Sequence, residues 1–148
     1  MTPFDLAQRY IGIKELPGGK DNPLIQWWLS LCGFSTDSPD EVPWCSAFVN
    51  GIAWELRLPR SKSAAARSWI TVGVPIPIHE ARPGNDIVIL KRGEGDQPGP
   101  EVLAAPGHVG FFAGLYGPRV YVLGGNQGDA VTIAPYPVER ILGIRRLA

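Results

Sequence analysis

The chain has no excess of charge of either sign, because its 14 lysine and arginine residues are balanced by 14 aspartate and glutamate residues. Nucleic-acid binding draws on a clustered excess of cations that displaces counterions from the phosphates. The basic pair Arg145 and Arg146 is interpreted as a solvated chain end. We therefore expect no nucleic-acid partner.

Long apolar runs are also missing. No window of 18 residues is apolar throughout, and the N-terminal stretch contains acidic residues instead of the basic and apolar regions of a signal peptide. The sequence therefore predicts neither a membrane span nor a signal peptide.

Cysteine and histidine are scarce, with only Cys32, Cys45, His79 and His108 in the chain. The two cysteines are 13 residues apart and the two histidines 29, which matches no zinc-binding spacing, so we expect no metal and no cofactor. Without a signal peptide, both cysteines are expected as free thiols. These four side chains are the candidates for a nucleophile or a base near neutral pH.

Glycine and proline are abundant, with 18 and 15 residues, and predict a domain rich in loops. The length of 148 residues favours a single domain over residues 1–148. Helical spacing dominates residues 1–75 and strand-like segments dominate residues 84–148, which predicts an α+β fold with N-terminal helices packed on a C-terminal antiparallel sheet. We expect helices at 3–11, 23–31, 45–56 and 64–70, and strands at 86–90, 108–115, 119–123, 130–133 and 141–144.

Cys45 differs from Cys32 in its position. A helix is predicted to begin at Cys45, where the helix dipole and unpaired backbone N–H groups favour a thiolate and can hold an oxyanion. Cys32 lies at the end of an apolar helix, where a cysteine behaves as a small buried hydrophobe. Cys45 is therefore the candidate nucleophile.

His108 opens a predicted strand directly after a loop rich in glycine and proline, whereas His79 lies in an extended segment and is expected to be exposed. If this strand pairs with the next one through the turn at residues 116–118, its start lies opposite the end of its partner. Asn126 then falls beside His108, where its amide can orient the imidazole toward a thiolate.

Three ordered segments resemble a known family: VPWCSAFVN at 42–50, GHVGF at 107–111 and VLGGNQ at 122–127. They are similar to the CHAP and NlpC/P60-like papain-fold peptidases, in particular a small group common in bacteriophages and prophages. The resemblance covers residues 6–146. It implies a papain-like fold, Cys45 as nucleophile, His108 as general base and Asn126 as the orienting residue.

The resemblance also implies peptidoglycan as substrate, cut at an amide bond by an endopeptidase or an N-acetylmuramoyl-L-alanine amidase. It implies a phage endolysin, held in the host cytoplasm until holin-type release, or a virion-associated lysin joined to a tail or baseplate complex. Two other interpretations stay open. One is a secreted or tail-associated toxin or transpeptidase that uses the same thiol, and the other is an inactive wall-binding or tail structural module.

The chain departs from the family at two places. The opening of the first long strand, Gly84-Asn85-Asp86, is one residue longer than usual, which can introduce a bulge, and Gly124 stands where relatives often have an acid. Gln127 and Asp129 are therefore alternatives to Asn126 as third catalytic member.

Three other groups of residues are assigned from the sequence. Trp44, Gln127 and Asp129 are candidate substrate-binding residues, with Trp44 expected to line the cleft. Some CHAP relatives bind calcium, but the acidic residues before Cys45 lack the alternating pattern of a calcium loop, so no metal is expected there. These acidic residues are Asp37, Asp40 and Glu41. The tryptophans expected in the core are Trp27, Trp28, Trp54 and Trp69.

Overall fold

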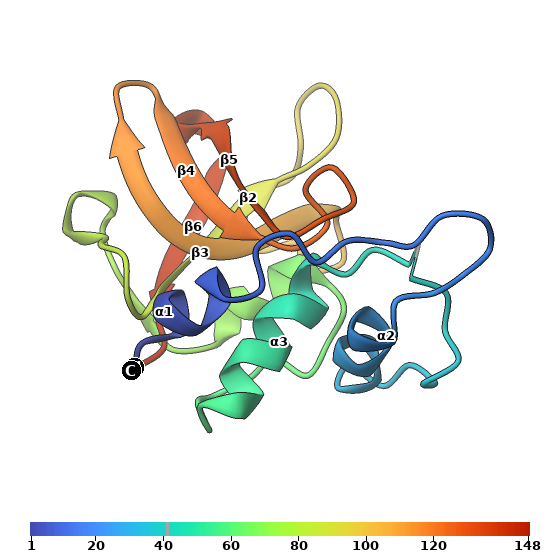
Figure 1. Ribbon diagram of the computed structural model, residues 1–148. Helices are drawn as coiled ribbons and strands as arrows, with labels where there is room; N and C mark the ends of the chain where they lie inside the picture. Colours follow the sequence, from blue (N-terminus) through green and yellow to red (C-terminus); the bar gives the residue numbers. More distant parts are fainter. Residues whose placement is uncertain (41) are drawn as a thin grey trace.

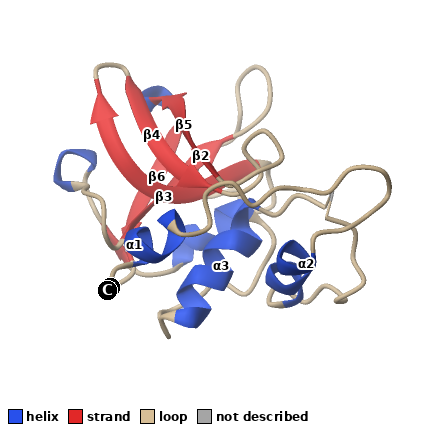
Figure 2. Cartoon of the chain, in the orientation of Figure 1, coloured by secondary structure: helices blue, strands red, loops and turns tan. Residues whose placement is uncertain are grey.

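Helices from the first half of the chain cover one face of an antiparallel sheet made by the second half (Figures 1 and 2). The computed structural model describes residues 1–40 and 42–148. This arrangement confirms the α+β fold that the order of the sequence patterns predicts.

The three α-helices begin at the residues expected from the sequence, Pro3, Pro23 and Cys45. The Thr2 side chain accepts from the Asp5 backbone, and the Asp5 side chain accepts from Thr2 in return, a capping box that starts α1. The Asn22 side chain caps α2, and Pro23 occupies its first turn. The predicted fourth helix is a 3-10 helix. The helical elements are α1 (Pro3–Gln8), α2 (Pro23–Ser30), α3 (Cys45–Glu55), η1 (Ala66–Thr71), η2 (Ile78–Glu80) and η3 (Val138–Arg140).

The sheet has six strands in the order β1-β6-β2-β3-β4-β5, and every neighbouring pair is antiparallel. Strands β2 to β5 form a meander, and β6 returns to the free edge of β2. The short strand β1 is not predicted from the sequence. The strands are β1 (Val74–Pro75), β2 (Asp86–Lys91), β3 (Gly107–Tyr116), β4 (Arg119–Gly124), β5 (Thr132–Pro137) and β6 (Ile141–Arg146).

The longer opening of β2 does not bulge the start of that strand. The register between β2 and β6 shifts instead between Ile89 and Leu90, further along the pair. At the start of β2, the buried Asp86 accepts two bonds from the Arg146 guanidinium, at 2.7 and 2.9 Å. Arg146 is therefore a half-buried partner of the buried Asp86 in an ion pair, which corrects its interpretation as a solvated end.

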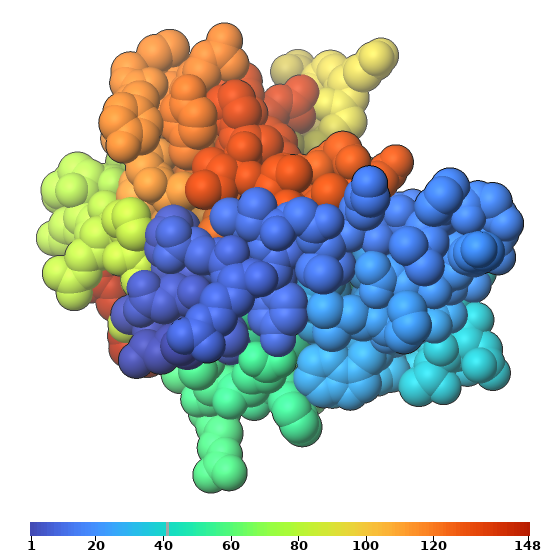
Figure 3. Space-filling model, viewed as in Figure 1, coloured from blue at the N-terminus to red at the C-terminus, as the bar shows by residue number. Residues whose placement is uncertain are grey.

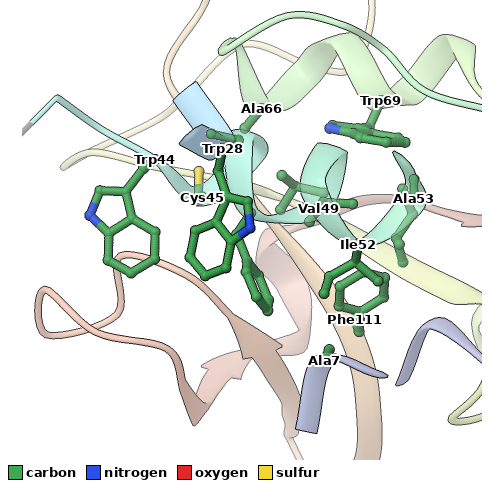
Figure 4. Packing of buried hydrophobic residues seen from close by; sticks show 14 of the residues in the cluster. Ala7, Trp28, Trp44, Cys45, Val49, Ile52, Ala53, Ala66, Trp69 and Phe111 are labelled. Atoms are coloured by element: carbon green, nitrogen blue, oxygen red, sulfur yellow. The ribbon is translucent and has the colours of Figure 1, made fainter. Parts of the chain in front are cut away.

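Helix α3 is the centre of the core. All nine residues from Cys45 to Ala53 are buried, as expected for a helix covered on every side. Figure 4 shows the Cys45 sulfur at the end of this helix, in the packed group that also contains Trp28 and Trp44. The nucleophile candidate thus begins a helix whose first nine residues are all buried.

Among the tryptophans expected in the core, Trp28 and Trp69 are fully buried. Trp54 is 49% exposed, which corrects its assignment, although its ring packs edge-on against Trp27 at 5.2 Å. Trp54 follows the buried segment of α3 and lies on the turn that reaches solvent.

The N-terminal stretch after α1 lies along the segment that follows β4, as the space-filling view shows in blue and orange-red (Figure 3). Backbone bonds link Gly12 with Val131, Val131 with Ile13, and Glu15 with Asp129. These bonds fix the loop that carries residues 125–131. In the described part of the chain, no helix combines the length and apolar character needed to cross a membrane.

Candidate active site

Cys45 occupies the first position of α3 and is 3% exposed. Burial raises the pKa of its thiol, while backbone N–H groups of Val109 and Ser46 and the charge of Arg92 lower it. Helix α3, which begins at Cys45, packs against β3, and Cys45 belongs to the same buried cluster as Val109, the residue that follows His108. The resting thiol is thus protonated, and its surroundings already contain donors that would stabilise a thiolate.

His108 is the second residue of β3 and is 4% exposed. Its Nε2 lies 2.9 Å from Oε1 of Gln127, and its ring packs against the Tyr136 ring at 5.3 Å. Burial lowers the pKa of His108 to about 4, and the hydrogen bond to Gln127 opposes this shift. At neutral pH the imidazole is therefore uncharged and able to accept a proton.

The hydrogen bonds of Gln127 determine which nitrogen of His108 carries the proton. The Gln127 Nε2 donates to the carbonyl of Thr132 at 2.7 Å and to that of Val122 at 3.2 Å, so its Oε1 must face His108. The Tyr136 hydroxyl donates to the same Oε1 at 3.0 Å. Since Oε1 only accepts, His108 donates through Nε2–H, which leaves the Nδ1 lone pair free to act as a base.

Among the described residues, Gln127 and not Asn126 forms a hydrogen bond with the imidazole, which corrects the expected partner of His108. If the pairing of β3 with β4 continued, Asn126 would lie opposite His108. Asn126 instead adopts a left-handed conformation with φ 58°, so the chain turns away before that position. The next residue, with a side chain longer by one methylene, reaches the ring. Asn126 lines the adjacent cavity instead.

Two consecutive glycines make room for this arrangement. A Cβ on Gly124 would lie 2.8 Å from the Gln127 Oε1, and one on Gly125 would lie 2.7 Å from the Trp44 ring. The absence of an acid at position 124 therefore has a steric reason in this structure. Any side chain there would displace the hydrogen-bonding partner of His108.

Trp44 does not line a cleft. It is 0% exposed, its ring stacks on Trp28 at 5.9 Å, and its Nε1 donates to the Glu15 carboxylate at 3.0 Å. The interpretation of Trp44 as a substrate-binding residue is corrected: the ring packs in the core next to the start of α3. Asp129 is exposed in the loop after β4, with φ 60°, and the side-chain hydrogen bond of His108 among the described residues goes to Gln127 and not to Asp129.

Two cavities meet at the site. One, of about 360 Å³, is lined by His108, Asn126, Gln127 and Tyr136 together with three cations: Lys91, Arg92 and Arg140. The other, also of about 360 Å³, is lined by Cys45 and by small apolar residues. Arg92 lines both cavities.

Sequence reasoning missed Tyr136, Thr132 and Arg92. Thr132 and Tyr136 lie on β5, and nothing in their local pattern indicates that this edge strand faces His108. The signal for Arg92 is present, because Lys91 and Arg92 are adjacent cations at the end of a buried strand and the start of the loop that leads to His108.

Arg67 holds in place the loop that connects β2 to β3 and leads to His108. It is fully buried on η1 and donates to the carbonyls of Pro98, Gly99 and Pro106 at 2.7 to 3.0 Å. A guanidinium can satisfy several carbonyls at once because its donors form a planar fork. The hydrogen bonds of Arg67 thus hold the loop that forms one wall of the apolar cavity.

Within residues 1–40 and 42–148, no group of three or more His, Cys, Asp or Glu side chains is arranged to hold a metal ion. Asp40 is buried and accepts from the backbones of Leu16 and Asn22, at 2.9 and 2.8 Å, so it ties two loops together. Asp37 is exposed, and Glu41 lies outside the described residues.

Cys32→Ser is expected to keep activity within about twofold of wild type and to cost about 1 kcal/mol of stability. Cys32 is a half-buried free thiol whose pKa is raised to about 11 by burial, so it is protonated and unreactive at neutral pH. Steady-state rates and urea unfolding of the purified variant check this. Loss of activity in a fully folded variant would contradict a structural role for this thiol.

Stability is expected to fall in mild acid because of His108. Its folded pKa of about 4 lies below the ordinary value of 6.5, so between these values the unfolded chain binds a proton that the folded chain does not. The stabilisation is complete above pH 6.5 and disappears toward pH 4. Between pH 7 and 4.5 we expect this residue to remove about 2–3 kcal/mol from the free energy of unfolding.

Urea unfolding of wild type and His108→Gln across this pH range isolates the contribution of the imidazole, because other titrating groups are common to both proteins. As the pH falls, the free energy of unfolding of wild type should decrease relative to that of His108→Gln. Parallel curves would show that burial does not depress the pKa of His108.

The comparisons with known proteins concern the fold. No family model and no curated protein match the chain. Among solved structures, it is similar to an NlpC/P60 family protein from Bacillus cereus ATCC 10987, at TM-score 0.57 and 16% identity over 99% of this chain and 39% of that one. It is also similar to NlpC1 from Trichomonas vaginalis, at TM-score 0.50 and 19% identity over 98% of this chain and 42% of that one.

The chain thus spans about two fifths of the length of each of these structures, and nearly all of its own residues take part in both matches. At identities of only 16% and 19%, these structural matches show the fold alone. The fold expected from the three sequence segments is confirmed: this chain has the papain-like fold of NlpC/P60 family proteins, with N-terminal helices packed on a six-stranded antiparallel sheet.

Proposed function

We propose that this protein is a cysteine hydrolase that cleaves an amide bond in the peptide part of peptidoglycan. The observation that carries the proposal is the hydrogen bond that Nε2–H of His108 donates to Oε1 of Gln127, because it leaves the Nδ1 lone pair pointing away from Gln127 and available as a base. A buried thiol at the start of a helix, beside the same strand, supplies the nucleophile.

The resting pair is best described as a neutral thiol and a neutral imidazole, because burial raises the pKa of Cys45 and lowers that of His108. In the proposed mechanism, His108 takes the thiol proton at Nδ1 as the sulfur attacks the carbonyl carbon of the substrate. Forming the ion pair only during the attack avoids the cost of burying two charges in the resting enzyme.

The start of α3 then stabilises the tetrahedral intermediate. The N-cap residue Trp44 offers no side-chain bond to the first turn, so the backbone N–H of Cys45 is available to the oxyanion. His108, now protonated, gives its proton to the leaving amine as the C–N bond breaks. Water attacks the resulting thioester, its proton passes to His108, and the acid and the free thiol are released.

Peptidoglycan as substrate is supported by the motif resemblance and by the fold shared with NlpC/P60 family proteins. The same motifs support a lysin of the phage group, acting as an endopeptidase or as an N-acetylmuramoyl-L-alanine amidase. In this proposal the protein reaches the wall after release from the host cytoplasm or as part of a virion.

The test is to incubate the protein with purified peptidoglycan and to identify the new termini by mass spectrometry. New amino termini within peptides would indicate an endopeptidase, and free lactyl groups on the glycan would indicate an amidase. Cys45→Ala serves as the inactive control. Absence of new termini in the presence of folded wild-type protein, across walls with different peptide chemistry, would overturn the proposal.

A further inference from the structure

The cavity beside His108 has an unusual charge for a protein with no net charge. Three cations line it, Lys91, Arg92 and Arg140, and no aspartate or glutamate does. Among the described residues, none of the three forms an ion pair with a carboxylate. Cations gathered in a concave site without acidic partners indicate an anionic ligand.

The three cations differ in their freedom. Arg140 donates to the carbonyls of Lys91 and Gly93, at 3.2 and 3.0 Å, which holds its guanidinium against the loop after β2. Lys91 and Arg140 also line a neighbouring cavity that contains Asp96 and Glu139, so acids partly offset their charge.

Arg92 is the cation whose charge is least offset. It is exposed, and the two cavities that it lines contain no acidic residue. Its charge lowers the pKa values of Cys45, His108 and Tyr136, so its field reaches both reacting groups. It therefore stands at the junction of the two halves of the site.

The second cavity has the opposite character. It contains Cys45 and is lined by the alanines at 64–66, 104 and 105 and by Pro43, so apart from Arg92 it offers a small apolar surface. Since the sulfur bonds to the acyl carbon, the acyl side of the substrate lies in this cavity. The surface suits a residue with a small uncharged side chain, such as alanine.

The leaving group must lie on the other side. A general acid gives its proton to the leaving nitrogen from hydrogen-bond distance, so that nitrogen lies next to His108 and the residue that contains it enters the cationic cavity. A volume of about 360 Å³ is sufficient for one amino-acid residue with its carboxylate.

We propose that the site selects an amide bond whose acyl side is a small apolar residue and whose leaving amine belongs to a residue with a free carboxylate, bound by Arg92. This inference rests on the proposed function and narrows it, because it favours an endopeptidase that cuts next to a carboxylate-bearing residue. The planar guanidinium can bind a carboxylate through two parallel hydrogen bonds, which a carboxamide cannot replace.

The test compares soluble wall peptides with the same peptides after conversion of their carboxylates to carboxamides by carbodiimide and ammonia. Calorimetric binding to the Cys45→Ala protein should be at least about fivefold tighter for the free carboxylates. Adding Arg92→Gln should remove this preference. With active protein, kcat/KM should fall by a similar factor on amidation, and the released amine should carry the carboxylate.

Arg119→Gln is the matched control. Arg119 is exposed at the far end of β4, roughly 17 Å along the strand from Gly124, and lines neither cavity. This variant should keep the preference. Equal binding of both peptide forms by the Cys45→Ala protein, or an unchanged preference in Arg92→Gln, would overturn the carboxylate site.

The binding measurement does not depend on catalysis. Preferential binding without any cleavage by wild-type protein would overturn the proposed function and keep the carboxylate site. Cleavage of both peptide forms at equal rates would keep the proposed function and overturn the carboxylate site.

Discussion

Cys45→Ala is expected to lower kcat/KM on peptidoglycan peptides by at least about 10⁴-fold. Removing the nucleophile of a covalent mechanism removes the whole acyl-transfer route, and what is left comes from binding and oxyanion stabilisation alone. The half-buried Cys32, with a pKa raised to about 11 by burial, offers no replacement thiolate. Release of new termini over time, wild type against variant, measures the effect.

The fold should tolerate this change. Cys45 begins α3 between Trp44 and Ser46, and alanine keeps the Cβ while removing only the sulfur, so we expect a loss of about 1–2 kcal/mol in the free energy of unfolding. Far-UV circular dichroism and urea unfolding of the variant verify this. Activity within tenfold of wild type in the folded variant would show that Cys45 is not the nucleophile.

Local signals were sufficient for most of the fold. The helix starts expected at residues 3 and 23 are reproduced, because the caps at Thr2 and Asn22 depend only on residues within one turn. The strands were found because β2 and β4 are short apolar segments bounded by turn residues. The two-residue β1 was missed, since such a short strand exists only through its pairing with β6.

The site was harder to predict, because the hydrogen-bond partner of His108 depends on the conformation of the turn after β4. Pairing of β3 with β4 was expected, and it was found, but a one-residue difference in the turn after Gly124 gives the hydrogen bond to Gln127. Trp44 was misplaced for a related reason. Adjacency to Cys45 in sequence says nothing about which face of the chain it occupies, and the ring packs on Trp28 in the core.

Gln127→Leu is expected to lower kcat by about 10²–10³-fold with little change in KM, the second largest effect. Without the amide oxygen, His108 can take either tautomer and loses the partner that stabilises its protonated form during attack. Loss of tautomer control is worth up to about 10⁴-fold in an established catalytic triad. Single-turnover and steady-state rates on the same peptide separate chemistry from binding.

Leucine also leaves the carbonyls of Val122 and Thr132 and the Tyr136 hydroxyl without their partner, so the variant should lose about 2–4 kcal/mol of stability. Gln127→Glu gives a second readout that a structural defect would not produce. A carboxylate beside Nε2 stabilises the imidazolium, so the acid limb of the pH–rate profile should move to higher pH.

Asn126→Gly is the matched control for both variants. Glycine accepts the left-handed conformation at φ 58° without strain, so this change removes the neighbouring amide and leaves the turn intact. It should retain activity within about fivefold of wild type, because the Asn126 side chain makes no hydrogen bond among the described residues.

If Asn126→Gly lost activity as Gln127→Leu is expected to, and Gln127→Glu left the pH profile unmoved, the orienting role would belong to Asn126 in the working enzyme. Retention of activity by Asn126→Gly together with a shifted profile in Gln127→Glu would assign that role to Gln127, since only a group bonded to the imidazole changes the proton affinity of the base.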